Sequence, residues 1–151
     1  MGTNLDFRLP NDQWKAVQPE AGQAFLALHT GVFEYFCPNI SADLAELSQD
    51  GTLEASLGAT ADRMRKLGTD FTVSQRTIDE ETGGGLQQVE VTIQVADGVY
   101  RRISQAQVFA ILPLVDGENR LLLCLMLTAE SDTLQDYLED FQAFVQSVHP
   151  A

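Results

Sequence analysis

Few side chains in this sequence could carry out acid–base or nucleophilic chemistry near neutral pH. Histidine is the usual general base in that range, and the chain has two, His29 and His149. His149 stands in the final segment His-Pro-Ala, where we expect it to be solvated, and His29 precedes a Thr-Gly turn. A catalytic pair of His29 with Cys37 would need both side chains on one sheet face and a third group to orient the base. No third group is apparent, so we predict no catalytic residue and no enzymatic activity.

The cysteines, the acidic run and the glycine run do not match known metal or cofactor sites. Cys37 and Cys124 lie in apolar stretches, so we expect buried free thiols; a disulfide would require their strands to be neighbours. Neither has the Cys-x-x-Cys or Cys/His spacing of a zinc site. The acids at 79–81 lack the alternate ligand spacing of an EF-hand, and the glycines at 83–85 lack the helix and lysine of a phosphate-binding loop. We therefore predict no metal and no cofactor.

Two glutamines are more informative, because they fall on one face of a long predicted strand at 100–112. Gln105 and Gln107 are two residues apart, and Arg101 lies in the same row. Polar groups on a covered sheet face need hydrogen-bond partners. A neighbouring loop could supply them, or the row could line a pocket or a surface for another molecule. Arg101, Gln105 and Gln107 are therefore our candidate binding surface.

Length and charge limit the classes of partner. With 151 residues, 44% of them hydrophobic, the chain is typical of one domain with its own core, and we predict a single domain over 1–151. Its net charge of −13 disfavours nucleic acid, whose phosphates need clustered Lys and Arg, and also disfavours anionic membranes. No apolar stretch approaches the roughly 18 residues of a membrane span, and no signal peptide is recognisable. We expect a soluble, cytoplasmic protein; an exported form with its signal removed stays an alternative.

Apolar alternation and turn signals predict a sheet. Extended segments are expected at 7–9, 14–17, 24–29, 32–37, 71–78, 87–95, 100–112 and 120–128. The pair 24–29 and 32–37 is typical of a hairpin closed by a Thr-Gly turn, and 41–47 could form a short helical turn. The segment 120–128 is apolar on both faces, so its sheet must be covered on both sides.

Two segments have the spacing of amphipathic helices. The first follows Thr52, whose hydroxyl can cap the free amides of the first turn. The second follows Thr133, which fits a capping-box pattern with Asp136. Its apolar stripe comprises Leu134, Tyr137, Leu138, Phe141, Val145 and Val148. Successive strands with one helix on each face predict an α+β fold, a three-layer α/β/α sandwich around a mostly antiparallel sheet.

Several landmarks follow one another in a distinctive order along the chain. They are FRLPNDQW, FCPNI, DGTLEASLG, SQAQVFAILPL and LCLMLTAESDTLQDYLEDFQAFVQSV, and together they extend over nearly the whole sequence. This order resembles the actinobacterial LpqN-type lipoprotein family. The resemblance implies a PsbP-like fold, shared with a yeast Ran-binding protein, in a group whose members bind or assemble other molecules. The sequence departs from the family in lacking an export signal and a lipidated N-terminal cysteine.

These observations predict a non-enzymatic protein-binding or assembly module. The alternative is a small-ligand carrier with a pocket between sheet and helix, which should enclose an apolar cavity of roughly 300 Å³ or more. We expect a protein partner, and an uncovered sheet edge would also allow a homodimer.

Overall fold

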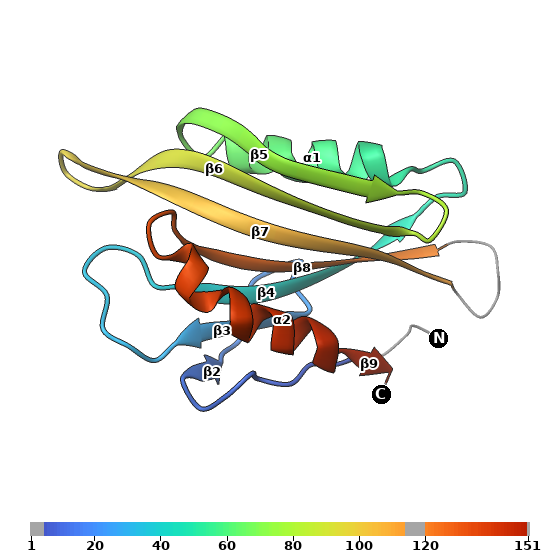
Figure 1. The fold of residues 1–151 in the computed structure, drawn as a ribbon, viewed down its shortest axis with the longest axis horizontal. Coiled ribbons are helices and arrows are strands. Elements are labelled where there is room, and N and C mark those ends of the chain that lie inside the picture. The colour runs from blue at the N-terminus through green and yellow to red at the C-terminus, as the bar shows by residue number, and fades with distance from the viewer. Residues whose placement is uncertain (1–4, 114–119, 151) are drawn as a thin grey trace.

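The computed structural model describes residues 5–113 and 120–150, and an antiparallel sheet runs through it (Figure 1). Seven strands lie in the order β2-β3-β4-β8-β7-β6-β5. Their bounds are β2 Trp14–Ala16, β3 Phe25–His29, β4 Asn39–Leu47, β5 Thr69–Asp79, β6 Gly84–Ala96, β7 Val99–Pro113 and β8 Arg120–Glu130. Two short strands, β1 (Leu5–Asp6) and β9 (His149–Pro150), pair with each other and bring the N- and C-terminal segments together.

β8 is the middle strand, and it is covered on both faces as the sequence predicts. It pairs with β4 on one side and with β7 on the other along most of its length. Every residue from 123 to 129 is buried. Leu123, Leu125 and Leu127 belong to one core cluster, while Cys124 and Met126 belong to another on the opposite face. The three-layer α/β/α sandwich is therefore confirmed.

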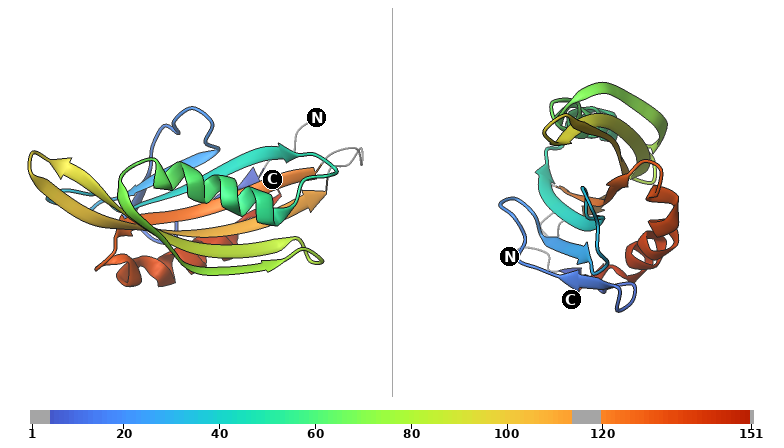
Figure 2. Two further views of the ribbon diagram at one scale, coloured as in Figure 1. Left: turned by 90° about the horizontal axis from the view of Figure 1, so that it is seen from above. Right: turned by 90° about the vertical axis from the view of Figure 1, so that its left-hand side faces the viewer.

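Helix α1 (Leu53–Arg65) begins where the sequence predicts and covers one face of the sheet (Figure 2). Oγ1 of Thr52 accepts a hydrogen bond from the amide of Ala55 at 3.1 Å, which satisfies one free N–H of the first turn. The buried residues of the helix recur every three or four positions and are Leu53, Leu57, Thr60, Ala61 and Met64. One side of α1 consequently packs on β5 and β6.

The C-terminal helix begins differently from the prediction. Leu134–Tyr137 form a 3-10 helix, η1, and the α-helix α2 spans Leu138–Ser147. Thr133 makes no capping bond, because its hydroxyl donates to the backbone oxygen of Glu130. The capping-box prediction is therefore wrong. Phe144, which the predicted stripe omits, is fully buried, because it lies three residues after the buried Phe141 and on the same face of α2.

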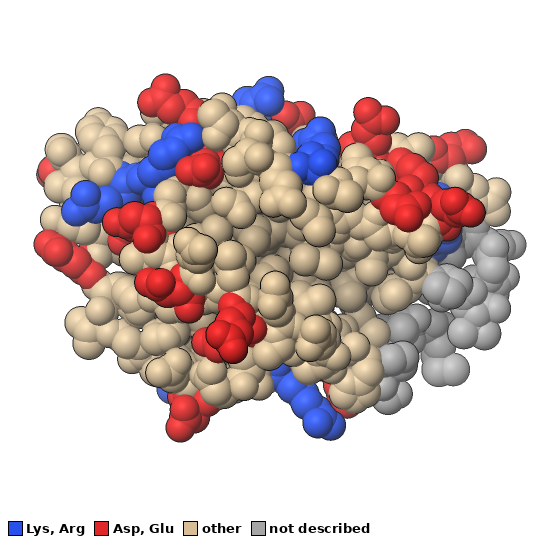
Figure 3. Space-filling view, viewed as in Figure 1, with Lys and Arg blue, Asp and Glu red and all other residues tan. Residues whose placement is uncertain are grey.

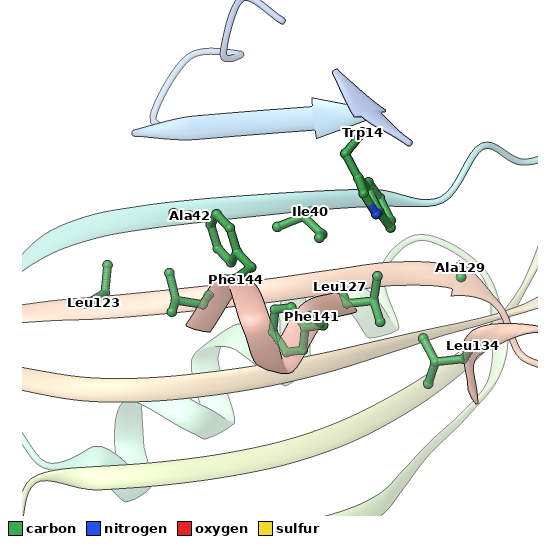
Figure 4. Packing of buried hydrophobic residues seen from close by; sticks show 10 residues of the cluster. Trp14, Ile40, Ala42, Leu123, Leu127, Ala129, Leu134, Phe141 and Phe144 are labelled. Atoms are coloured by element: carbon green, nitrogen blue, oxygen red, sulfur yellow. The ribbon is translucent and has the colours of Figure 1, made fainter. Parts of the chain in front are cut away.

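Phe144 is the centre of an aromatic stack under α2. Its ring centroid lies 5.3 Å from that of Phe25 on β3 and 6.1 Å from that of Phe7. Figure 4 shows Phe144 and Phe141 projecting from α2 towards β8 and β4. The stack joins the N-terminal segment, the sheet and the last helix in one core.

Two predicted elements between residues 32 and 47 are wrong. Residues 32–37 form a loop, and the hairpin partner of β3 is β4, which begins after Pro38. Residues 41–47, predicted as a helical turn, belong to β4. The reason is tertiary: β4 pairs with the apolar β8 along its whole length, and a local helical turn would lack that burial and those hydrogen bonds.

The two helices cover different parts of the sheet (Figure 2). α1 packs on β5 and β6, and its Leu53 and Leu57 also pack with Cys124 on one face of β8, whereas η1 and α2 pack on the other face of β8. On the α2 side, the strands β5 to β7 therefore present a face without a helix. Figure 3 shows this face: charged side chains stand mostly around its margin, and the middle, between β5 and α2, is uncharged.

Replacing Phe144 by alanine should destabilise the fold by about 3–5 kcal/mol, the usual cost of removing a buried phenylalanine ring. The loss combines the lost burial with the cavity left between β3 and α2. Urea denaturation followed by circular dichroism measures it, and Val32→Ala, at a fully exposed position, is the control. A cost below about 1 kcal/mol would contradict the packing described above.

Candidate functional site

The predicted binding row, Arg101, Gln105 and Gln107, lies along one face of β7, on the side of α1. The three residues differ in exposure. The side chain of Arg101 is 44% exposed, Gln105 is half-buried, and Gln107 is 1% exposed. The structure therefore separates a surface arginine near the start of β7 from two glutamines further along, inside the sandwich.

The glutamines belong to a line of side-chain hydrogen bonds across the sheet, which we call the glutamine ladder: Gln87, Gln107 and Gln105. Gln87 on β6 donates to Oε1 of Gln107 at 2.6 Å and to the backbone oxygen of Leu57 on α1 at 2.9 Å. Gln107 donates to Oε1 of Gln105 at 2.6 Å. Gln105 in turn donates to the hydroxyl of Thr128 on β8 at 2.8 Å.

The ladder begins at the edge of the sheet, where Nε of Arg76 on β5 donates to Oε1 of Gln87 at 2.8 Å. The side-chain amides of the ladder donate hydrogen bonds to one another and accept them from one another, so these polar groups have partners although they are buried or half-buried. The partners lie on other strands and on α1 rather than on a neighbouring loop. Gln105 and Gln107 are thus committed to the interior of the fold, and Arg101 is the member of the row that reaches solvent.

Arg101 lines a shallow, open pocket of about 240 Å³ at one end of the sheet, which we call the Arg101 pocket. The Arg101 guanidinium lies 4.8 Å from the ring centroid of Tyr35, a cation–π contact, and 3.4 Å from the carboxylate of Glu130. The lining residues are Tyr100, Arg101, Arg102, Glu130, Ser131 and Asp132. Tyr35 comes from the β3–β4 loop, which we predicted as a strand, so no sequence pattern indicated this contact.

Arg102 is used inside the fold, although it also lines the pocket. It donates to Oε1 of Glu90 at 3.2 Å and to the backbone oxygen of Asp70 at 2.8 Å. It further donates to the hydroxyl of Thr72 at 3.0 Å. These bonds tie β7 to β5 across β6. The carboxylate of Asp132, by contrast, forms no ion pair with any residue that the structure describes, so the uncommitted charge of the pocket is negative.

His29 and Cys37 do not form a catalytic pair. Sγ of Cys37 lies 3.4 Å from the backbone oxygen of His29, to which the thiol donates. The ring Nδ1 of His29 accepts from the amide of Gly31 at 3.0 Å. Burial raises the pKa of Cys37, so the thiol stays protonated at neutral pH. Both side chains therefore anchor the β3–β4 loop.

The second thiol, Cys124, lies opposite Asp43 in the pairing of β8 with β4. Burial raises the pKa of Cys124 to about 12, and the negative charge of Asp43 adds to the effect. Burial also raises the pKa of Asp43, against the lowering effect of Arg63 on α1. Oδ1 of Asp43 is buried without a hydrogen-bond partner among the described residues. Cys37 and Cys124 are free thiols rather than a disulfide.

The acidic run 79–81 supports the local structure. The carboxylate of Glu80 accepts from the amides of Leu53 and Glu54, at 3.0 and 3.2 Å, and so caps the N-terminus of α1. Within residues 5–113 and 120–150, no group of three or more His, Cys, Asp or Glu side chains is placed to hold a metal ion.

Solved structures of proteins with low sequence identity share this fold. LpqN of Mycobacterium tuberculosis, described as involved in cell envelope biogenesis, is 15% identical with a TM-score of 0.67, over 99% of this chain and 84% of that one. The cyanobacterial PsbP of Synechocystis is 15% identical with a TM-score of 0.56, over 97% and 86%. The Ran-binding protein Mog1p of Saccharomyces cerevisiae is 11% identical with a TM-score of 0.50, over 98% and 96%. The chain has the LpqN-type, PsbP-like fold that the sequence resemblance implies.

Sequence comparison adds no further relative: no family model and no curated protein matches the chain. At such low identities the structural likeness shows the fold alone. In the part of the chain that the structure describes, the helices are too short or too polar to cross a membrane.

Replacing Asp43 by asparagine should stabilise the protein at neutral pH. Because burial raises the pKa of Asp43 above its ordinary value of 3.8, its charge costs stability above the folded-state pKa, and the cost is gone below the unfolded-state pKa. At neutral pH we expect the variant to melt at a higher temperature than the parent, because the partly buried charge has been removed. At about pH 3 the variant and the parent should melt together. Asp12→Asn, on an exposed residue, is the control, and a gain that persists in acid would contradict the electrostatic cause.

Replacing Gln107 by methionine should cost about 1–3 kcal/mol of stability, the usual penalty for unsatisfied buried polar groups. The side chain keeps its length, but Gln87 loses an acceptor and Gln105 loses a donor. Urea denaturation measures the change, with Gln94→Met on an exposed position of β6 as the matched control. Equal midpoints for the two variants would show that the ladder does not stabilise the fold.

Proposed function

We propose that the chain is a non-enzymatic protein-binding or assembly module whose partner docks at the Arg101 pocket. The observation that carries this proposal is the composition of the pocket rim. Arg101 lies over the ring of Tyr35, and Tyr100, which also lines the pocket, is 59% exposed. Tyrosine and arginine are enriched among the residues that dominate the binding energy of protein interfaces. An open pocket of about 240 Å³ has room for a side chain of a partner.

The charges around the pocket favour a basic group on the partner. Glu130 is paired with Arg101, and Glu90 is paired with Arg102. Asp132 has no ion pair with any described residue, so it is available to a lysine or arginine of another protein. The net charge of −13 would draw a basic surface towards the chain over a longer range.

Proteins of the same fold support a binding role. Mog1p is a Ran-binding protein, and LpqN is described as involved in cell envelope biogenesis. One fold can serve many functions, so this likeness adds to the evidence of the pocket and does not replace it.

A small-ligand carrier, the alternative, would hold its ligand between the sheet and a helix. Under α2 that space is filled by Phe141 and Phe144, and under α1 by Leu53 and Leu57, all of them at most 3% exposed. The Arg101 pocket is open and is lined largely by charged and hydroxyl side chains. These contacts favour docking of a partner over enclosure of a ligand.

The non-enzymatic part of the proposal is supported by the state of the two thiols. Both have a raised pKa because of burial, about 12 for Cys124, so neither is a thiolate at neutral pH. The cytoplasmic location stays a prediction from the sequence, with an exported form as its alternative. Cell fractionation followed by immunoblotting distinguishes the two.

Photocrosslinking in the native cell tests the docking site. A photoreactive phenylalanine analogue in place of Tyr100 should give one discrete adduct with another protein, identified by mass spectrometry. The same analogue in place of Leu9, which is 38% exposed, is the position control. The adduct at Tyr100 should be lost when Asp132 is also changed to lysine, because the partner's basic group would then meet a positive charge in place of the unpaired carboxylate.

With the partner identified, Arg101→Ala and Tyr35→Ala should each weaken binding by about tenfold or more in calorimetry. Lys15→Ala, on an exposed residue of β2, should leave the affinity unchanged. Identical adducts at Tyr100 and Leu9, or an affinity that neither rim variant changes, would exclude the Arg101 pocket as the docking site.

A further inference from the structure

Strand β5 forms one edge of the seven-stranded sheet, and no segment within 5–113 or 120–150 pairs with its outer side. It is 11 residues long, and all but two of these residues are exposed. The strand at the other edge, β2, has 3 residues. A long free edge presents a row of unpaired amide and carbonyl groups, which can pair with a strand of another chain.

Exposed apolar side chains gather along this edge. The large hydrophobic side chains that are exposed in the described part of the chain are Leu9, Val32, Leu67, Val73, Leu86 and Tyr100. Half of them belong to the β5 edge. Leu67 (63% exposed) precedes the strand, Val73 (40%) lies near its middle, and Leu86 (39%) lies opposite Thr77 on β6. The three side chains are spread along the length of the edge, so a strand paired with β5 would run past all of them.

We propose that two copies of this chain pair through β5, antiparallel and about a two-fold axis at Val73, so that the two sheets become one. Two-fold symmetry is the commonest arrangement of homodimers, and it makes the same edge serve both copies. The exposed Val73 side chains of the two copies then cover each other at the axis. The outer amide and carbonyl groups of β5 gain hydrogen-bond partners.

The charges of Arg76 and Asp70 favour a two-fold axis at Val73 over an axis at a neighbouring residue. Residues at equal distances from a two-fold axis lie opposite each other in an antiparallel pair. With the axis at Val73, Arg76 of each copy comes beside Asp70 of the other, which gives two equivalent ion pairs. An axis one residue to either side would bring Arg76 to an uncharged residue, and an axis at Arg76 would bring the two arginines together.

Both charged groups are available for this contact. Nε of Arg76 is bonded to Gln87, and the terminal guanidinium nitrogens have no other partner among the described residues. The carboxylate of Asp70 has none there either, while its backbone oxygen is held by Arg102 at 2.8 Å. Asp70 has a φ of 55°, which is uncommon for a residue other than glycine. Arg102 thus fixes the acidic residue at the edge before a second copy arrives.

Two irregularities of β5 agree with the same axis. Its register with β6 shifts between Thr69 and Thr72, and again between Val73 and Gln75. About an axis at Val73, the first shift in one copy meets the second shift in the other. The two shifts compensate, so Thr77 again lies opposite Thr69. Bulges normally hinder edge pairing, but these match a second copy of the same strand.

Cysteine crosslinking tests the axis directly. In a Cys37→Ser background, Val73→Cys should form a disulfide-linked dimer under mild oxidation, because opposite residues of paired strands lie close enough for a disulfide. Thr77→Cys, on the same exposed strand, should stay monomeric. Residue 77 of one copy lies opposite Thr69 of the other, so the two introduced cysteines are several residues apart. No crosslink at Val73, or an equal crosslink at Thr77, would overturn the proposed axis.

A charge exchange tests the ion pairs in the otherwise unchanged chain. Sedimentation velocity over about 5 to 500 µM should show a concentration-dependent dimer. Arg76→Asp and Asp70→Arg should each raise the dissociation constant by about tenfold or more, and the double exchange should restore it to within about threefold. Lys15→Asp and Asp12→Arg change the net charge equally at exposed residues outside β5 and should have much smaller effects.

Folding of each variant is checked by its circular dichroism spectrum, because Arg76 also bonds to Gln87. If Arg76→Asp does not fold, Val73→Lys takes its place, since two lysines at the axis repel each other and should abolish the dimer. A parent chain that stays monomeric throughout, single reversals without effect, or a double exchange that fails to restore the dimer would each overturn the proposal.

Discussion

The burial of β8 on both faces is the constraint on which the rest of the structure depends. Its side chains from 123 to 129 point alternately to the two faces, and all are buried. Such a strand is stable only in the middle of a sheet with a cover on each side. β4 and β7 satisfy its backbone groups, and the apolar sides of α1 and α2 supply the covers. The position of the helices on opposite faces follows from this one strand.

Polar groups inside the sandwich are handled by directional hydrogen bonds rather than by ion pairs. The glutamine ladder joins β6, β7, β8 and α1 with neutral amides, which cost less to bury than charges. Arg102 remains near the surface, where it ties β7 to β5. Asp43 is the exception, since one of its oxygens is buried without a partner in the described part of the chain. These features stabilise and specify the pairing of strands, and they leave Arg101 and the outer edge of β5 to meet other molecules.

The sequence correctly predicts those elements whose conformation depends on neighbouring residues in the chain. The Thr52 cap, the alternation that buries Val89 and Val91 on β6, and the doubly buried β8 are all found as predicted. β4 was missed because its strand conformation depends on pairing with β8, which is distant in the sequence. The predicted stripe omits Phe144, although this residue follows Phe141 by three positions and shares its face of α2.

The candidate site shows the same division. Alternation along β7 correctly places Arg101, Gln105 and Gln107 on one face. Which of them reaches solvent depends on the packing above that face. There Gln87 donates hydrogen bonds to Gln107 and to the backbone of α1, which keeps Gln107 in the interior. The contact of Tyr35 with Arg101 depends on the path of a loop, and no spacing in the sequence encodes it.

Strand β4 also sets the order in which the chain can fold. β5 to β8 follow one another as neighbours, so their contacts close short loops, whereas β4 must reach β8 across α1 and the whole meander. Loop-closure entropy makes such non-local pairing slow. Until β4 pairs with β8, one edge of this most apolar strand is exposed. At a high concentration of newly synthesised chains, this intermediate is therefore prone to aggregation.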